Sequence, residues 1–158
     1  MSAEGKSVLE DLEEIVSAGG DRVSALQAVA DILQRHGHYR WVGLYDVDRT
    51  GGMVTNIVWS GPAAPEYPTF PITRGLTGAA ISQRKTVNVG DVATDPRYLT
   101  AFDTTRAEII VPVFDRARES VLGTIDIESE QKNAFTGEAQ AWLEACSGVI
   151  GPLWNRAR

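Results

Sequence analysis

Hydrophobic residues in the first third of the chain recur at the spacing of one face of an α-helix. Two such stripes are present: Val8, Leu12, Ile15 and Val16, and then Val23, Leu26, Val29 and Leu33. Gly19 and Gly20 separate the stripes, Asp21 is a suitable N-cap for the second helix, and Gly37 is a suitable end for it. We therefore expect two helices within about residues 5–36.

From Tyr39 the pattern changes to the alternation of β-strands, in which every second side chain shares a face. Six segments read as strands: 39–47, 53–60, 69–72, 86–89, 107–114 and 120–128. Residues 48–52 form a turn sequence that predicts a hairpin between the first two strands. A short helix is expected at 79–84, and a last helix follows residue 137 with a face of Trp142, Cys146, Val149 and Leu153.

This order of elements predicts an α+β fold with an antiparallel sheet of about six strands. We expect the N- and C-terminal helices on one face of the sheet and a ligand pocket under loops and short helices on the other. The stretch 61–106 is long and poor in regular structure, as binding loops often are. The length suits a single domain over 1–158, with its core at about 39–153.

The strands predict one apolar face and one mixed face. The mixed face carries Trp41, Tyr45, Glu108, Asp126 and Glu128. Acids are normal on a solvated sheet face, and that is one interpretation. Two large aromatic side chains on open surface would be unfavourable, so we expect the 61–106 stretch to cover them as a lid. Gly43 lacks a side chain between the aromatics, which predicts room for a ligand.

Three carboxylates that face a covered cavity must be paired, protonated or neutralised. A cationic group such as an amine would neutralise them. Thr77 is a candidate N-cap of the short helix, whose amide end favours negative charge. A site with both features would suit a zwitterion such as an amino acid, while for Thr77 itself a plain helix cap is the preferred interpretation.

Composition narrows the classes of function. The net charge is −6, which disfavours nucleic acids and anionic membrane surfaces. The N-terminal segment lacks an apolar signal region and no apolar run could span a bilayer, so we expect a cytoplasmic protein. The single cysteine, Cys146, and the two histidines, His36 and His38, give no zinc-type spacing, and we expect neither a metal nor a cofactor.

Six segments, in this order and spacing, resemble GAF domains. They are 75–80 (GLTGAA), 85–92 (KTVNVGDV), 95–98 (DPRY), 108–113 (EIIVPV), 122–129 (LGTIDIES) and 133–136 (NAFT). The resemblance covers about residues 21–153 and implies a module that encloses one small molecule. It also implies association as a homodimer through the terminal helices.

Within GAF domains the chain looks most like the free methionine-(R)-sulfoxide reductases. Residues 41–45 (WVGLY) match their Trp-x-Gly-x-Tyr segment, and Glu108 matches the glutamate of their Ser-Glu-Ile-Val segment. Asp126 and Glu128 match the two acids of their Asp-Ile-Asp-Ser segment, with glutamate in place of the second aspartate. In that family these residues line the pocket for free methionine sulfoxide.

The chain departs from those reductases at their three cysteine positions. Thr77 stands in the Gly-Val-Cys-Gly turn, no cysteine lies near Ala64, and the third position falls at Ala101 or Phe102. Because thiol redox chemistry needs a thiolate nucleophile and a resolving thiol, the pocket is expected to persist without that chemistry. Phe102 is counted with the candidate ligand-binding residues, and no residue is assigned a catalytic role.

Three functions fit these observations. The first is a sensory or regulatory module that binds a small polar or zwitterionic metabolite. The second is an enzyme, either a sulfoxide reductase with different chemistry or a hydrolase that uses the paired acids. The third is a structural dimerisation module. A bilin or haem would need a cysteine in the lid or a suitably placed histidine, and the match of Asn133, Phe135 and Glu138 to cyclic-nucleotide GAF domains is only partial.

Overall fold

The computed structural model describes residues 2–99 and 102–156. Its helices are α1 (Ala3–Ser17), α2 (Arg22–Gly37), α3 (Gly75–Gln83) and α4 (Gly137–Ile150), with the 3-10 helices η1 (Val92–Thr94) and η2 (Gly151–Asn155). Its strands are β1 (Trp41–Asp48), β2 (Met53–Ser60), β3 (Thr69–Pro71), β4 (Val87–Val89), β5 (Ala107–Phe114) and β6 (Val121–Ser129).

The six strands form one antiparallel sheet in the order β3-β2-β1-β6-β5-β4, so the predicted α+β class is confirmed. The predicted hairpin is the β1–β2 pair. β1 begins two residues later than expected, at Trp41. The reason is that His38 adopts a left-handed conformation at the end of α2 (φ 53°) and Tyr39 N still donates to the Gln34 carbonyl.

The two predicted N-terminal helices are confirmed, and Asp21 caps α2 by accepting a hydrogen bond from Ser24 N at 2.9 Å. The prediction that Val23 lies on the buried face of the second helix is wrong, because Val23 is 45% exposed. The neighbouring Arg22 is buried instead. Its guanidinium donates to the Asp46 carboxylate and to the Trp154 carbonyl, each at 3.3 Å, so the buried charge has partners.

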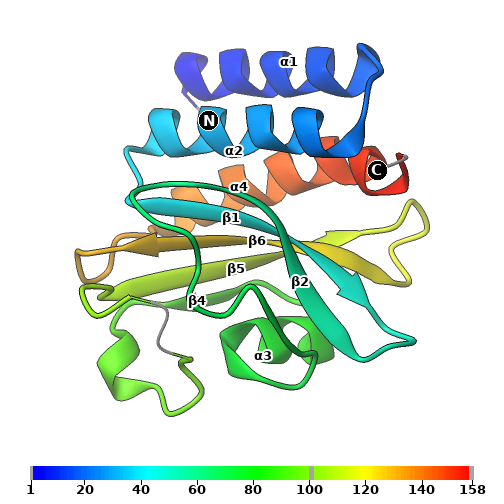
Figure 1. Cartoon of the computed structure of the whole chain (residues 1–158). Coiled ribbons are helices and arrows are strands. Elements are labelled where there is room, and N and C mark those ends of the chain that lie inside the picture. Colours follow the sequence, from blue (N-terminus) through cyan, green and yellow to red (C-terminus); the bar gives the residue numbers. More distant parts are fainter. Residues whose placement is uncertain (1, 100–101, 157–158) are drawn as a thin grey trace.

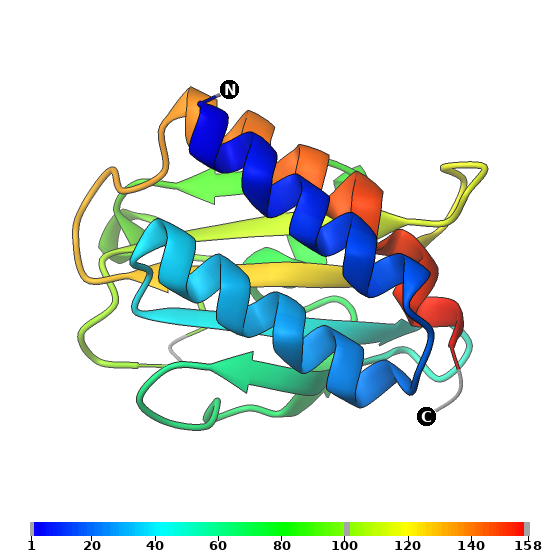
Figure 2. The same cartoon turned by 90° about the horizontal axis from the view of Figure 1, so that it is seen from above.

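Three helices lie on one face of the sheet, as expected. α2 packs on β1 and β2, while α4 packs on β5. α1 lies outside both of these helices and packs mainly against them (Figures 1 and 2). The apolar strand faces and these helices together form the main hydrophobic core, which includes Cys146. In the part of the chain that the structure describes, no helix is long and apolar enough to cross a membrane.

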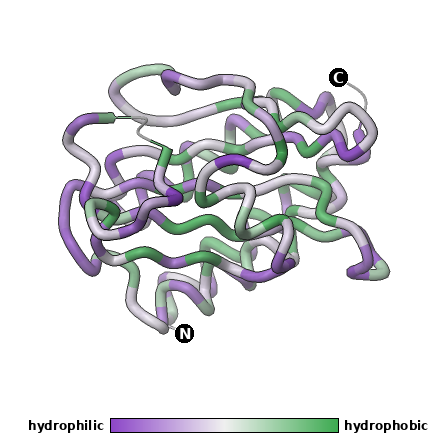
Figure 3. Tube along the Cα trace, turned by 90° about the horizontal axis from the view of Figure 1, so that it is seen from below, coloured by the Kyte–Doolittle hydropathy of each residue, from purple (hydrophilic) through white to green (hydrophobic). Residues whose placement is uncertain are grey.

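The other face of the sheet is covered by α3, η1 and the long connections around them (Figure 1; seen from below in Figure 3). These elements belong to the 61–106 stretch, so the predicted lid lies where it was expected. A second group of apolar residues forms under it, around Trp41, Tyr45, Val54 and Phe70.

Besides the bond from Arg22 to Asp46, a second hydrogen bond connects the helical layer to β1, the strand that carries Tyr45. Trp154 Nε1 in η2 donates to the Tyr45 carbonyl at 3.0 Å. The indole can reach this oxygen because Gly123 of β6 has no side chain. A Cβ at Gly123 would lie 2.0 Å from Trp154 Nε1 and 2.3 Å from the Tyr45 carbonyl oxygen.

Candidate functional site

Three carboxyl groups come together on the lid side of the central strands. Glu108 and Glu128 are direct cross-strand partners in β5 and β6, and Asp126 lies two residues before Glu128 on the same face. One carboxylate oxygen of each lies within 4.8 Å of the other two. Glu108, Asp126 and Glu128 are only 5%, 8% and 1% exposed, respectively. The strand alternation therefore predicted a real cluster, which we call the acid triad.

Aromatic side chains form the wall beside the acid triad. The ring centroid of Trp41 lies 6.4 Å from that of Tyr45 and 5.6 Å from that of Phe102. Tyr45 in turn lies 5.8 Å from Phe70, edge to face. Trp41 Nε1 donates to the carbonyl of Ala63 in the lid at 3.0 Å, which satisfies the indole as it becomes buried. Phe102 thus joins the site through Trp41, while Ala101 lies outside the described residues.

The expectation that Gly43 leaves room for a ligand is wrong. A Cβ at this position would lie 2.2 Å from Trp41 Cη2 and 3.0 Å from Tyr45 Cε2. The Trp41 ring therefore occupies the space that a side chain at position 43 would fill. Gly43 lets this ring pack against the strand as a wall of the site, so it does not leave space for a ligand.

Thr77 is not the cap of α3. The N-cap is Arg74, no side chain caps this helix, and Thr77 is its third residue, 4% exposed. The first backbone N–H groups of a helix have no partner within the helix, so an end without a side-chain cap favours an anionic group. Thr77 still reaches the site, because it lines a small closed cavity together with its neighbours.

This cavity has a volume of about 30 Å³ and lies between the acid triad and the start of α3. Its lining residues are Tyr45, Pro65, Tyr67, Phe70, Gly75, Leu76, Thr77, Leu99, Glu108 and Asp126. Carboxyl groups and a helix N-terminus thus line the same space. A volume of this size holds about one or two water molecules.

Burial controls the protonation of the acid triad. Burial, followed by the neighbouring negative charges, raises the pKa of Glu108 and of Asp126 well above the ordinary range. Burial also raises the pKa of Glu128 to about 7, against the lowering effect of hydrogen bonds from Thr105 and Tyr98. Among the described residues, Asp126 Oδ1 and Glu128 Oε2 have no hydrogen-bond donor. A proton on Glu108 would supply one, and the raised pKa values of the triad favour such a proton.

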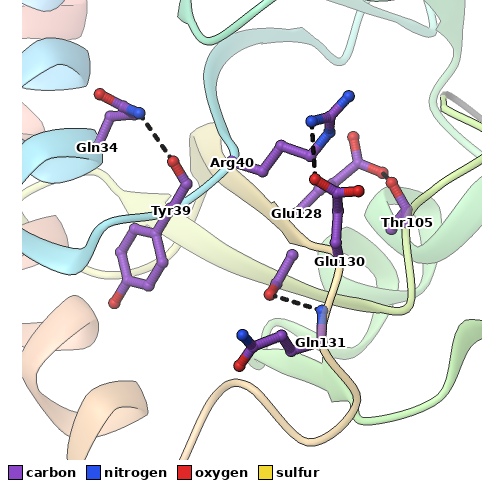
Figure 4. Close-up of polar contacts among 8 residues, drawn as sticks. Gln34, Tyr39, Arg40, Thr105, Glu128, Glu130 and Gln131 are labelled. Atoms are coloured by element: carbon purple, nitrogen blue, oxygen red, sulfur yellow. Dashed lines mark hydrogen bonds and ion pairs between the residues drawn. The ribbon is translucent and has the colours of Figure 1, made fainter.

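Two residues that were not among the candidate site residues fix Glu128 in place. Thr105 Oγ1 donates to Glu128 Oε1 at 3.0 Å (Figure 4), and the Tyr98 hydroxyl donates to the same oxygen at 3.2 Å. Arg40 lies nearby and pairs with Glu130 at 2.8 Å (Figure 4). Both hydroxyl groups come from the lid, so the lid is attached to the acid triad directly. Tyr98 belongs to the 95–98 motif, whereas Thr105 follows no pattern that predicts it.

Cys146 is part of the helical core on the opposite side of the sheet. Its side chain is fully buried, and burial raises the pKa of the thiol to about 12. We expect the native thiol to react with Ellman's reagent at pH 8 at least about a thousandfold more slowly than in the unfolded chain, because the thiolate is the reactive form. Absorbance at constant protein concentration, with and without denaturant, measures both rates. Rapid reaction of the folded protein would contradict this burial.

The architecture is that of a GAF domain: a six-stranded antiparallel sheet with helices on one face and a loop-covered cavity on the other. A solved GAF domain structure shares this fold, with a TM-score of 0.83 at 21% identity. The chain belongs to the GAF domain family, whose family description matches residues 21–151.

Several known proteins are similar to it over most of their length. GAF domain-containing protein A of Dictyostelium discoideum is 26% identical over 130 residues, which cover 82% of this chain and 79% of that protein. The free methionine-R-sulfoxide reductase of Neisseria meningitidis, solved with its substrate, is 28% identical with a TM-score of 0.86, and the match covers 96% of this chain and 88% of that one. The type II enzyme of Thermoplasma acidophilum is 30% identical with a TM-score of 0.79, over 91% and 95% of the two chains.

Proposed function

We propose that this protein is a regulatory GAF domain that binds a small zwitterionic metabolite, such as a free amino acid or its sulfoxide, without thiol redox catalysis. One observation carries the proposal: a single cavity is lined both by Glu108 and Asp126 and by the uncapped start of α3 at Gly75–Thr77. The carboxyl groups complement an ammonium group, and the helix start complements a carboxylate.

The cavity of about 30 Å³ is smaller than an amino acid, so binding requires displacement of its walls. We expect the lid to be the wall that moves, and the bonds from Tyr98 and Thr105 to Glu128 are the ones that must then break. An ammonium group would form its ion pair with an ionised carboxylate, and burial raises the pKa of both carboxyl groups that line the cavity, Glu108 and Asp126. Affinity for such a ligand should therefore increase with rising pH.

The similarity to the Neisseria and Thermoplasma reductases supports free methionine sulfoxide as the first ligand to test. It also keeps a reductase as the alternative function. The chemistry argues against that alternative, because Cys146 is the single cysteine of the chain and lies buried beyond the sheet. A thiol mechanism needs an accessible thiolate and a second thiol to resolve the oxidised form.

We expect free methionine sulfoxide, at about one hundred times its Kd, to raise the unfolding midpoint by roughly 5–10 °C. Asp126→Asn should weaken binding by at least about tenfold, because it removes a charge that pairs with the ligand in a buried site. Asp11→Asn, which makes the same change on the exposed surface of α1, should bind as the parent protein does. Differential scanning fluorimetry and titration calorimetry measure these effects.

A thermal shift with a cyclic nucleotide and none with methionine, its sulfoxide or other amino acids would show that the zwitterion proposal is wrong. Catalysis requires a separate measurement, since binding alone does not exclude it. NADPH-coupled turnover of free methionine sulfoxide at the rate of a reductase would overturn the assignment as a binding module.

A further inference from the structure

A second, much larger hollow lies on the surface beside α3, outside the closed cavity. It is an open groove of about 830 Å³. Its lining includes four arginines: Arg49, Arg74, Arg84 and Arg97. Glu119 is its only acidic lining residue among the described part of the chain. This concentration of positive charge contrasts with the net charge of −6 of the whole protein.

The arginines are spread along the groove rather than gathered at one point. Arg74 is the N-cap of α3 and Arg84 its C-cap. At 1.5 Å per residue, these two ends are about 15 Å apart along the helix axis. Arg84 donates to the Arg118 carbonyl and Arg49 Nη1 donates to Ser120 Oγ at 3.2 Å, so both side chains are held against the β5–β6 hairpin.

Most of this charge is available to a ligand. Arg97 already pairs with Asp95 at 2.7 Å, which neutralises it in part. In the described residues, none of Arg49, Arg74 and Arg84 forms an ion pair. The hydrogen bonds of Arg49 and Arg84 go to neutral acceptors and position these two guanidinium groups without cancelling their charge. Arginine presents several N–H donors in a plane that matches a carboxylate in a bidentate fashion.

We propose that this groove docks an extended acidic segment of a partner protein. A strand rises about 3.3 Å per residue, so a segment of about five residues spans the distance from Arg74 to Arg84. A single phosphate group could engage one end of the groove and would leave the other end unused. The proposal goes beyond ligand binding in the closed cavity and does not depend on it.

The position of the groove makes it suited to regulation. Gly75 and Leu99 line both the groove and the closed cavity. The same residues therefore separate the interior space from the surface on which a partner would dock. A docking segment would contact the outer side of the wall that encloses the cavity.

The test uses the full-length protein and a fluorescein-labelled hexaglutamate peptide, with binding followed by fluorescence anisotropy. We expect saturable binding that weakens between about 50 and 200 mM salt. The double variant Arg74→Gln/Arg84→Gln should bind at least about tenfold more weakly, from the loss of two charged contacts. Both residues are exposed, so the fold should be retained, and thermal unfolding checks that it is.

Arg35→Gln is the matched control, because Arg35 is an exposed arginine on α2 and lies outside the groove. It should change the affinity by less than about twofold. If Arg35→Gln lost as much affinity as the double variant, binding would depend only on the general charge of the surface, and the proposal would be wrong. Absence of saturable binding would also overturn it. ATP serves as the competitor: displacement of the peptide by ATP with a lower Kd would assign the groove to a phosphorylated small molecule instead.

Discussion

Gly123→Ala is expected to lower the free energy of unfolding by about 3 kcal/mol, the sum of overpacking and of a buried indole N–H that loses its acceptor. The added Cβ would lie 2.3 Å from the Tyr45 carbonyl oxygen and 2.0 Å from Trp154 Nε1, so the Trp154 side chain must move away. For a chain of this size the unfolding midpoint should fall by roughly 6–12 °C. Urea and thermal unfolding measure the change.

Gly148→Ala is the control for this substitution. Gly148 lies within α4 on its exposed side, and a Cβ there would meet no atom within 4 Å. Alanine should stabilise the helix by about 0.5–1 kcal/mol, because it restricts the unfolded chain more than glycine does. A Gly123→Ala protein as stable as the parent would show that the contact between η2 and β1 is not held as described.

The second large effect concerns the dependence of stability on pH. The folded-state pKa of Glu128 is raised from 4.5 to about 7, so the folded protein binds a proton that the unfolded chain releases. The contribution of Glu128 to the stability is therefore fully present below pH 4.5 and decreases as the pH rises to about 7. Glu128 alone should reduce the free energy of unfolding by about 3 kcal/mol between pH 5 and 8. The raised pKa values of Glu108 and Asp126 act in the same direction.

Glu128→Gln should remove the share of this decrease that Glu128 causes, because glutamine keeps the acceptor for Thr105 and Tyr98 and never ionises. The variant should be more stable than the parent protein at pH 8. Urea unfolding at intervals from about pH 5 to 8 gives both curves. Parallel curves for the two proteins would show that folding does not raise the pKa of Glu128.

The sequence predicted which residues lie in the site better than it predicted how they pack together. Trp41, Tyr45 and the acid triad were placed on one face by strand alternation, which has a fixed period and needs no knowledge of distant contacts. Cross-strand pairing then brought Glu108 opposite Glu128. The helical period of 3.6 in turn assigned Cys146 and the apolar residues of the last helix to the core.

Errors occurred where the outcome depended on packing between distant segments. The Trp41 ring fills the space beside Gly43, because the indole turns toward the lid and donates a hydrogen bond to the Ala63 carbonyl. Thr77 lies inside α3 because the helix starts four residues earlier than the hydrophobic pattern suggested. Thr105 follows no periodic pattern in an irregular connection, so its bond to Glu128 could be found only from the folded structure.

Association as a homodimer through the terminal helices stays a prediction. The outer surface of α1 carries five exposed acids and one exposed lysine: Glu4, Glu10, Asp11, Glu13, Glu14 and Lys6. A symmetric contact between two α1 helices would place these like charges opposite one another. Any dimer that forms should therefore be weaker at low salt than at high salt, and light scattering at two salt concentrations tests this.

The hydrogen bond from Trp154 to the Tyr45 carbonyl has a practical consequence for where a recombinant fragment can end. The family match ends at residue 151, which makes that residue an obvious end for a recombinant fragment. Such a fragment would lack Trp154, and with it the donor to the Tyr45 carbonyl and the acceptor for the Arg22 guanidinium. The strand that carries the aromatic wall would lose its support from the far side of the sheet. Fragments and fusions should therefore retain the chain through Arg156, whose guanidinium also donates to the Gly19 carbonyl after α1.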